Sequence, residues 1–241
     1  MAPLKRLVLD IETVGLPLES LGQRERAEVE RWAAREEVPA QVYSRLSLNE
    51  LTGRIVAIGL MNVDSGKGQV HFQPTEAERA SSEDDLAEFV PGSESDILEA
   101  FWELATSYDQ LITFNGRGFD LPFILLRSAV HRIPPRRDLM PNRYRNAVHC
   151  DLMDQLRYFG ATRTRSLNYY CQLLGIETLE NKGMDGSQVG TLWDEKRYVE
   201  IAEYCWGDVK STGELYRVWS TYINPFSEGS APAAASSPGA E

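Results

Sequence analysis

The chain has 241 residues, of which 42% are hydrophobic and 25% are charged, and 25 basic against 36 acidic side chains give it a formal net charge of −11. This length suits one sizeable globular domain, and the moderate glycine, proline and cysteine contents exclude collagen-like, disulfide-framework and wholly disordered proteins. The longest apolar stretch, residues 55–63, is about half of the roughly 20 residues that a membrane-spanning helix needs. We therefore expect a soluble cytoplasmic protein with reduced, buried cysteines at positions 150, 171 and 205.

The charge is unevenly distributed along the chain. Residues 127–165 contain nine arginines, no lysine and three aspartates, which makes this segment +6 and the remainder −17. Arginines interleaved with Tyr144 and Tyr158 favour forked contacts to phosphate and stacking on bases, and the alternative is a solvated arginine-rich surface.

Strand patterns dominate the first part of the chain. Residues 4–11 form a short apolar run that predicts a strand, and residues 19–36 predict a charged amphipathic helix inserted after it. Residues 53–62 and 69–73 flank a turn of hairpin composition and predict two antiparallel strands. The sheet is thus expected to begin with a three-strand antiparallel meander.

Helices and strands alternate in the second part of the chain. Helices are predicted over residues 95–108 (with Ser95 as the cap), 119–130, 152–159, 195–205 and 209–222, the last two as one or two elements, and strands over 110–114 and 147–150. Residues 227–241 are too poor in apolar groups to pack and predict a disordered tail. The fold class is therefore α/β, with a mixed five-stranded sheet, a three-strand antiparallel meander plus two parallel strands, flanked by helices.

Three short motifs bring carboxylates together. Asp10 and Glu12 share one face of the first strand, because strand side chains alternate. Asp120 follows a strand end and a glycine-containing loop, and Tyr204 and Asp208 share one face of a late helix. Each motif alone has a structural explanation, such as a helix cap for Asp120. Four converging acids, however, need cations to remain ionised, and oxygen ligands without histidine or thiolate favour Mg²⁺ or Mn²⁺.

These motifs resemble a known family. D-I-E-T at Asp10–Thr13, N-x-x-x-F-D at Asn115–Asp120 and Y-x-x-x-D at Tyr204–Asp208 are similar to the motifs of DEDD 3′-5′ exonucleases of the DnaQ-like, ribonuclease H-like superfamily. The tyrosine four residues before Asp208, with Glu203 where the histidine subclass has its base, indicates the DEDDy type. The chain further resembles stand-alone predicted exonucleases related to the proofreading domain of family B DNA polymerases.

The resemblance implies specific roles for these residues. Asp10, Glu12 and Asp208 would ligate one metal ion, Asp10 and Asp120 a second, and Tyr204 would orient the attacking water. A pair of Mg²⁺ or Mn²⁺ ions would activate that water and stabilise the departing 3′ oxygen. Substrate contacts are expected from the following residues: Thr13, Asn115, Phe119 and Lys182. For Asn115, support of its own loop is an equal alternative, and Asp151 and Asp154 are expected to favour the start of a helix.

The expected activity is metal-dependent removal of nucleotides from a 3′ end, acting on single-stranded DNA by preference and on RNA as an alternative. Residues 1–226 would form the ribonuclease H-like exonuclease domain, with residues 19–50 as a helical insertion and residues 227–241 as the tail. A DNA-repair or replication protein is the expected second partner. The alternatives are a nucleic-acid-binding module without the chemistry, a repair or replication scaffold, and a two-metal phosphodiesterase for RNA ends.

Overall fold

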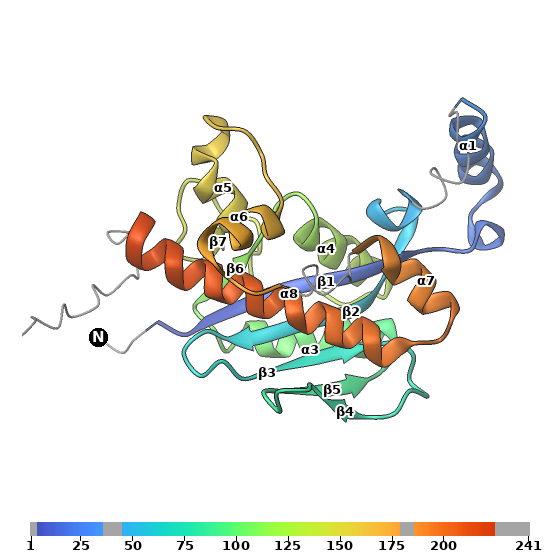
Figure 1. The fold of residues 1–241 in the computed structure, drawn as a ribbon. Helices are drawn as coiled ribbons and strands as arrows, with labels where there is room; N and C mark the ends of the chain where they lie inside the picture. Colours follow the sequence, from blue (N-terminus) through green and yellow to red (C-terminus); the bar gives the residue numbers. More distant parts are fainter. Residues whose placement is uncertain (1–3, 36–44, 179–185, 225–241) are drawn as a thin grey trace, which may run out of the picture.

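The computed structural model describes residues 4–35, 45–178 and 186–224 (Figure 1). The predicted disordered tail, part of the predicted insertion and Lys182 lie outside these residues. No helix in the described ranges combines the length and the apolarity needed to cross a membrane.

A seven-stranded mixed sheet forms the centre of the molecule, in the order β4-β5-β3-β2-β1-β6-β7. β1 pairs antiparallel with β2 and β2 with β3, while β6 runs parallel to β1 and β7 parallel to β6. The predicted meander and the two parallel strands are thus confirmed. The strands are β1 (Arg6–Gly15), β2 (Gly53–Asn62), β3 (Gly68–Phe72), β4 (Ala80–Ser81), β5 (Ala87–Pro91), β6 (Gln110–Thr113) and β7 (His149–Asp151).

The prediction of five strands was wrong, because β4 and β5 extend the sheet beyond β3. β5 pairs in parallel with β3 over five residues, and the two-residue β4 pairs antiparallel with β5. Only Ala87 and Phe89 of β5 point into the core, and the residues before it are acidic, so the pattern is too short to stand out.

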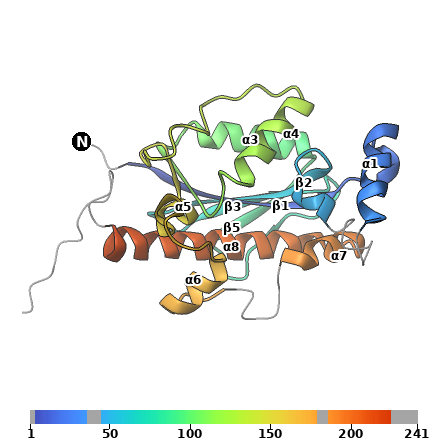
Figure 2. The same cartoon turned by 90° about the horizontal axis from the view of Figure 1, so that it is seen from above.

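Helices cover both faces of the sheet (Figure 2), with α3 and α4 on one face and α6, α7 and α8 on the other. The α-helices are α1 (Gln23–Ala33), α3 (Glu94–Ala105), α4 (Asp120–Val130), α5 (Leu152–Leu156), α6 (Leu167–Leu174), α7 (Val189–Asp194) and α8 (Tyr198–Val218). Helices α6 and α7 were not predicted, because they are only eight and six residues long. The cap of α3 is Ser93, not Ser95, because Ser93 and Asp96 form a reciprocal capping box.

Alternation along β1 separates two apolar cores. Leu7, Leu9 and Ile11 pack with α3 and α4, whereas Val8 and Val14 belong to the core under α8. Because side chains alternate, Asp10 and Glu12 lie on the same face as Val8, the face that α8 covers. A register shift in the pairing with β2 falls between Glu12 and Thr13, beyond both carboxylates, so it leaves their common direction intact.

A single 21-residue helix, α8, crosses this face. The sequence had predicted either one or two helices over residues 195–222. Gly59 of β2, the partner of Asp10 in the ladder, lies directly beneath α8. A Cβ atom at Gly59 would lie 2.6 Å from Val209 Cγ2 and 2.9 Å from Cys205 Sγ, so only glycine permits this approach. The close contact holds α8 against the strands that carry the acidic residues.

The region around α1 stands apart from the main sheet. Val29 and Ala33 of α1 pack with Leu46 in a small cluster of their own, and α1 projects at one end of β1 (Figure 1). The helix predicted over residues 19–36 is therefore present, shortened to Gln23–Ala33. The assignment of residues 19–50 as an insertion remains a prediction.

A buried ion pair joins α3 to α4. Glu94 receives two hydrogen bonds from Arg127, at 2.8 and 2.6 Å, and one from the main-chain N–H of Ile55, and all three residues are buried or nearly so. We expect Glu94→Gln to lower the free energy of unfolding by about 2 kcal/mol in urea titrations, because a buried charge loses its partner. Glu99→Gln is the control: its half-exposed pair with Arg136 is worth less than about 1 kcal/mol. Equal losses in both variants would contradict the expectation.

Candidate active site

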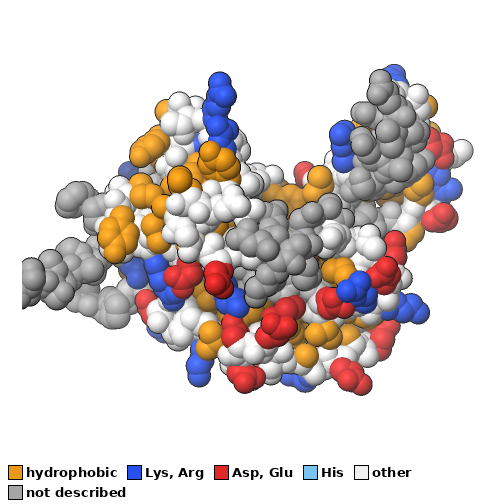
Figure 3. Space-filling view, viewed as in Figure 1, with side chains coloured by type: hydrophobic (Ala, Val, Ile, Leu, Met, Phe, Trp, Pro, Cys, Tyr) orange, Lys and Arg blue, Asp and Glu red, His pale blue; other side chains and the backbone are white. Residues whose placement is uncertain are grey.

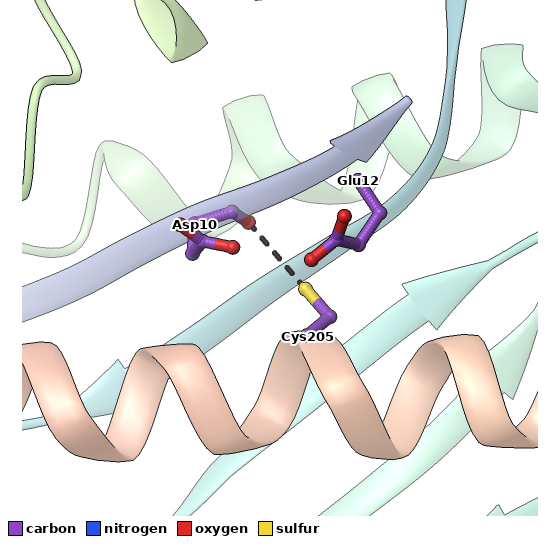
Figure 4. A group of neighbouring side chains, drawn as sticks. All are labelled: Asp10, Glu12 and Cys205. Carbon is purple, nitrogen blue, oxygen red and sulfur yellow. Dashed lines mark hydrogen bonds between the residues drawn. The ribbon is translucent and has the colours of Figure 1, made fainter. Parts of the chain in front are cut away.

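β1 presents two carboxylates to α8. The side chains of Asp10 and Glu12 point toward Cys205 of α8 (Figure 4), and one potential ligand atom from each of the three residues lies within 4.8 Å of the others. Burial raises the pKa of Asp10 well above its ordinary value, and the charges of Asp120, Asp208 and Glu12 add to the effect. Burial and the charges of Asp208 and Asp120 raise the pKa of Glu12 in the same way.

α8 supplies the next two predicted residues. Asp208 lies close enough to β1 to raise the pKa of both Asp10 and Glu12. Tyr204, one helical turn earlier, is buried in the core between α8 and the sheet. A methyl group added to Gly186 would lie 3.5 Å from the Tyr204 hydroxyl oxygen, so the hydroxyl lies beside the turn Gly186–Gln188 that precedes α7.

The fourth carboxylate comes from the start of α4. Asp120 is the first residue of this helix and is 3% exposed. Burial raises its pKa to about 7, helped by the charges of Asp151 and Asp208 and opposed by main-chain hydrogen bonds from its own N–H and from Ile11. The contact with Ile11 places Asp120 beside the segment between the two β1 carboxylates. The structure therefore brings together all four predicted acidic residues.

Cys205 is the member of this group that sequence analysis did not assign to the site. Its thiol donates a hydrogen bond to the main-chain oxygen of Asp10, with an Sγ to O distance of 3.7 Å (Figure 4). Burial and the charges of Asp10, Glu12 and Asp208 raise the pKa of the Cys205 thiol well above its ordinary value, so the thiol remains neutral. Its position directly after Tyr204 was the available signal, but a lone cysteine in an apolar helix also fits a core position.

The described residues predicted to contact substrate lie around this group. The Thr13 hydroxyl donates a 2.6 Å hydrogen bond to the main-chain oxygen of Ser47, which ties β1 to the turn at Arg45–Leu48. Asn115 adopts a left-handed backbone with φ of 65°, and its N–H donates to Asp151. Phe119 packs beside Phe123, with 5.0 Å between ring centroids. Their contacts with substrate remain predictions.

Asp151 anchors the loop that leads to Asp120. Its carboxylate accepts hydrogen bonds from the N–H groups of Asn115 and Arg117, each at 3.0 Å, and from those of Met153 and Asp154 at the start of α5. The expectation that Asp151 and Asp154 favour the start of a helix is confirmed, since Asp151 caps α5 and Asp154 lies in its first turn. The same residue also fixes the loop whose end carries Asp120.

The donor set fits hard divalent cations. The charge of Asp208 raises the pKa of Asp10, Glu12 and Asp120, so these carboxylates form a poorly neutralised group, and oxygen ligands suit Mg²⁺ or Mn²⁺. Cys205 is the one soft donor among them, and its neutral thiol points to a main-chain oxygen. Asp10, Glu12, Asp120 and Asp208 are therefore the residues that could hold metal.

Comparison with known proteins decides the family. The model for predicted 3′-5′ exonucleases related to the exonuclease domain of PolB matches residues 47–228. The chain belongs to this family. The match includes Asp120, Tyr204 and Asp208 and begins after β1, so Asp10 and Glu12 are assigned from their position beside them. The prediction of a 3′-5′ exonuclease is confirmed at the level of this predicted exonuclease family.

The fold of this family member is similar to a solved polymerase structure. The family B DNA polymerase from the hyperthermophilic archaeon Pyrobaculum calidifontis matches 90% of the chain with a TM-score of 0.58 and 17% identity. The chain spans 24% of that polymerase's length, and at this identity the likeness concerns the fold. No curated protein matches the chain in sequence.

Proposed function

We propose that this exonuclease hydrolyses the terminal phosphodiester bond of a single-stranded 3′ end, with DNA as the preferred strand, at a site that holds two Mg²⁺ or Mn²⁺ ions. The observation that carries the proposal is the convergence of Asp10, Glu12, Asp120 and Asp208 from β1, α4 and α8. The family match supports the reaction class and the 3′-5′ direction.

The side chains of the site would contribute metal ligands and a group that positions the water. The four carboxylates would ligate the ions, and bound ions lower the pKa of a water molecule and offset the charge on the phosphate. Tyr204, which is held in the core between α8 and the sheet, would orient the attacking water through its hydroxyl group. The burial of Glu12 and Asp120 favours an unpaired terminus, because a base pair would have to open before the terminal phosphodiester reached the acids.

A time course on 5′-labelled oligonucleotides tests this function. We expect single-stranded DNA to shorten stepwise from its 3′ end in Mg²⁺ or Mn²⁺ and to stay intact in EDTA, with RNA and duplex DNA as parallel substrates. Intact substrate under every metal, with binding still detectable by gel shift, would contradict the proposal and favour a nucleic-acid-binding module.

The role of Tyr204 has its own test. We expect Tyr204→Phe to lower kcat by about a hundredfold with little change in KM, because the water loses a positioning contact while the metal ligands remain. Tyr216→Phe is the control, since Tyr216 is also buried on α8 but its hydroxyl donates to Gln110 at 3.4 Å. A kcat for Tyr204→Phe equal to that of Tyr216→Phe would remove Tyr204 from the reaction.

A further inference from the structure

A pocket lies beside the proposed active site. It has a volume of about 350 Å³ and is formed by the loop after β6, the start of α5 and the segment around Arg143. Asp151 forms part of its wall and binds the N–H groups of Asn115 and Arg117, which belong to the loop that leads to Asp120. The pocket and the acidic site therefore share one loop.

Unsatisfied polar atoms gather in this pocket. Arg117 Nη2, Arg157 Nε and Asp154 Oδ2 are buried and have no hydrogen-bond partner among the residues that the structure describes. Buried donors and acceptors without partners are costly, so a pocket that concentrates them is suited to a polar ligand. The volume is sufficient for a sugar and its phosphate.

The charge in the pocket favours an anion. Arg117, Arg143 and Arg157 line it, and the carboxylate of Asp151 is already satisfied by four main-chain N–H groups. Asp154 pairs with Arg143 through one oxygen. Two guanidinium groups therefore retain N–H donors for a ligand, and guanidinium geometry matches phosphate oxygens.

The other arginines of the basic segment 127–165 differ in their use. Arg127 is paired with Glu94 inside the core, Arg136 is paired with Glu99, and Arg137 donates to the main-chain oxygens at the end of α3. These three serve the fold. Of the nine arginines in this segment, Arg143 and Arg157 line the pocket.

Aromatic residues directly follow two of the pocket's arginines in the chain. Tyr144, next to Arg143, is 70% exposed and lies 4.9 Å from the ring of Phe159. Tyr158 and Phe159 both have left-handed backbones, with φ of 48° and 55°, which ends α5 and sets the direction of these rings. In Figure 3, basic and hydrophobic side chains gather on the lobe of α5, at one side of a hollow.

We propose that this pocket and the Tyr144–Phe159 pair form a subsite for the single-stranded nucleic acid on the 5′ side of the bond that is cut. The terminal nucleotide occupies the acidic site, and the rest of the strand, on the 5′ side of the cut bond, has to continue across the neighbouring surface, where this pocket lies. Arg117 and Arg157 bind a backbone phosphate there, and a base stacks on the aromatic pair. This subsite rests on the proposed function, because it needs a 3′ end at the acidic site.

Binding measurements test the phosphate contact. The probe is 5′-fluorescein-labelled (dT)12 with the protein carrying Asp10→Asn, which prevents cleavage. We expect Arg117→Gln or Arg157→Gln to raise Kd about tenfold and to reduce the slope of log Kd against log salt by about 0.7, the value for one lost contact on a single strand. Arg136→Gln removes the same charge outside the pocket and should leave the slope unchanged. Equal slopes in all variants would overturn the subsite.

Turnover of a short and a long substrate distinguishes a failure of the subsite from a failure of the proposed reaction. With Asp10 intact, p-nitrophenyl thymidine 5′-phosphate is too short to reach the pocket, so its turnover should be the same in the wild type and in Arg157→Gln. The KM for (dT)12 should rise about tenfold in Arg157→Gln and stay unchanged in Arg136→Gln. A wild type that cleaves neither substrate would refute the proposed function. A wild type that cleaves both, with Arg157→Gln equal to Arg136→Gln, would refute the subsite only.

A surface variant tests the subsite independently, in case the arginine variants do not fold. Tyr144→Leu changes an exposed ring and leaves the buried pocket intact. Loss of base stacking should weaken (dT)12 binding about tenfold and leave the salt slope unchanged. Binding equal to that of Tyr169→Leu, another exposed tyrosine outside the pocket, would contradict the stacking role.

Discussion

Asp10→Asn is expected to lower kcat on single-stranded DNA at least about a thousandfold in saturating Mg²⁺. Asp10 is the carboxylate on which the charges of all three other acids act, and it is the residue expected to reach both ions. A neutral amide there would weaken binding of the proposed ions at the centre of the site. A loss of about 4 kcal/mol in transition-state stabilisation corresponds to this factor.

A matched carboxylate separates this effect from a general change in charge. Glu203 lies on α8 next to Tyr204, but its side chain accepts a hydrogen bond from the N–H of Glu83 and is outside the acidic group. Glu203→Gln should keep kcat within about threefold of the wild type. Comparable losses in Glu203→Gln and Asp10→Asn, measured with single-turnover kinetics, would show that the acidic group is not where the reaction occurs.

The second large effect is on stability without metal. In EDTA, the titration of Asp120 should lower the free energy of unfolding by about 4 kcal/mol as the pH rises from 4 to 7. Its pKa is about 7 in the folded protein and about 3.9 in an unfolded chain, so the unfolded state loses its proton first and is favoured across this window. Three pKa units at about 1.4 kcal/mol each correspond to this loss.

Urea titrations at several pH values provide the measurement. Asp120→Asn removes the titrating group, so its stability should change less steeply between pH 4 and 7 than that of the wild type. At pH 8, Mg²⁺ at a hundred times its Kd should stabilise the wild type by about 2.7 kcal/mol and Asp120→Asn by less. Parallel pH profiles for the two proteins, with no gain from Mg²⁺ in either, would show that the carboxylates are not a metal site.

Most of the candidate site could be predicted from local sequence patterns. The period of two along β1 places Asp10 and Glu12 on one face, and the turn of a helix places Tyr204 near Asp208, whatever the rest of the fold does. The core alternation in β1 follows the same rule. These features depend on residues that are neighbours in the chain, so a single sequence is sufficient to predict them.

Features that depend on distant partners were missed. β5 exists because β3 offers a free edge, and its own pattern of two buried residues is too weak to predict it. Cys205 lies among the acids because Gly59 lets α8 approach β1, a contact between residues almost 150 positions apart. The pocket beside Asp151 likewise joins three segments that the sequence does not relate.

The position of α8 has a consequence for the newly made chain. Asp10 is joined to Cys205 across 195 residues, and Asp208 lies just beyond, so the acidic group is assembled from opposite ends of the described chain. Closing such a long loop costs conformational entropy before the contact is made. With Asp208 as a proposed metal ligand, a ribosome-bound chain would hold an incomplete site until residue 208 has emerged. We therefore expect nuclease activity only once the chain extends through α8.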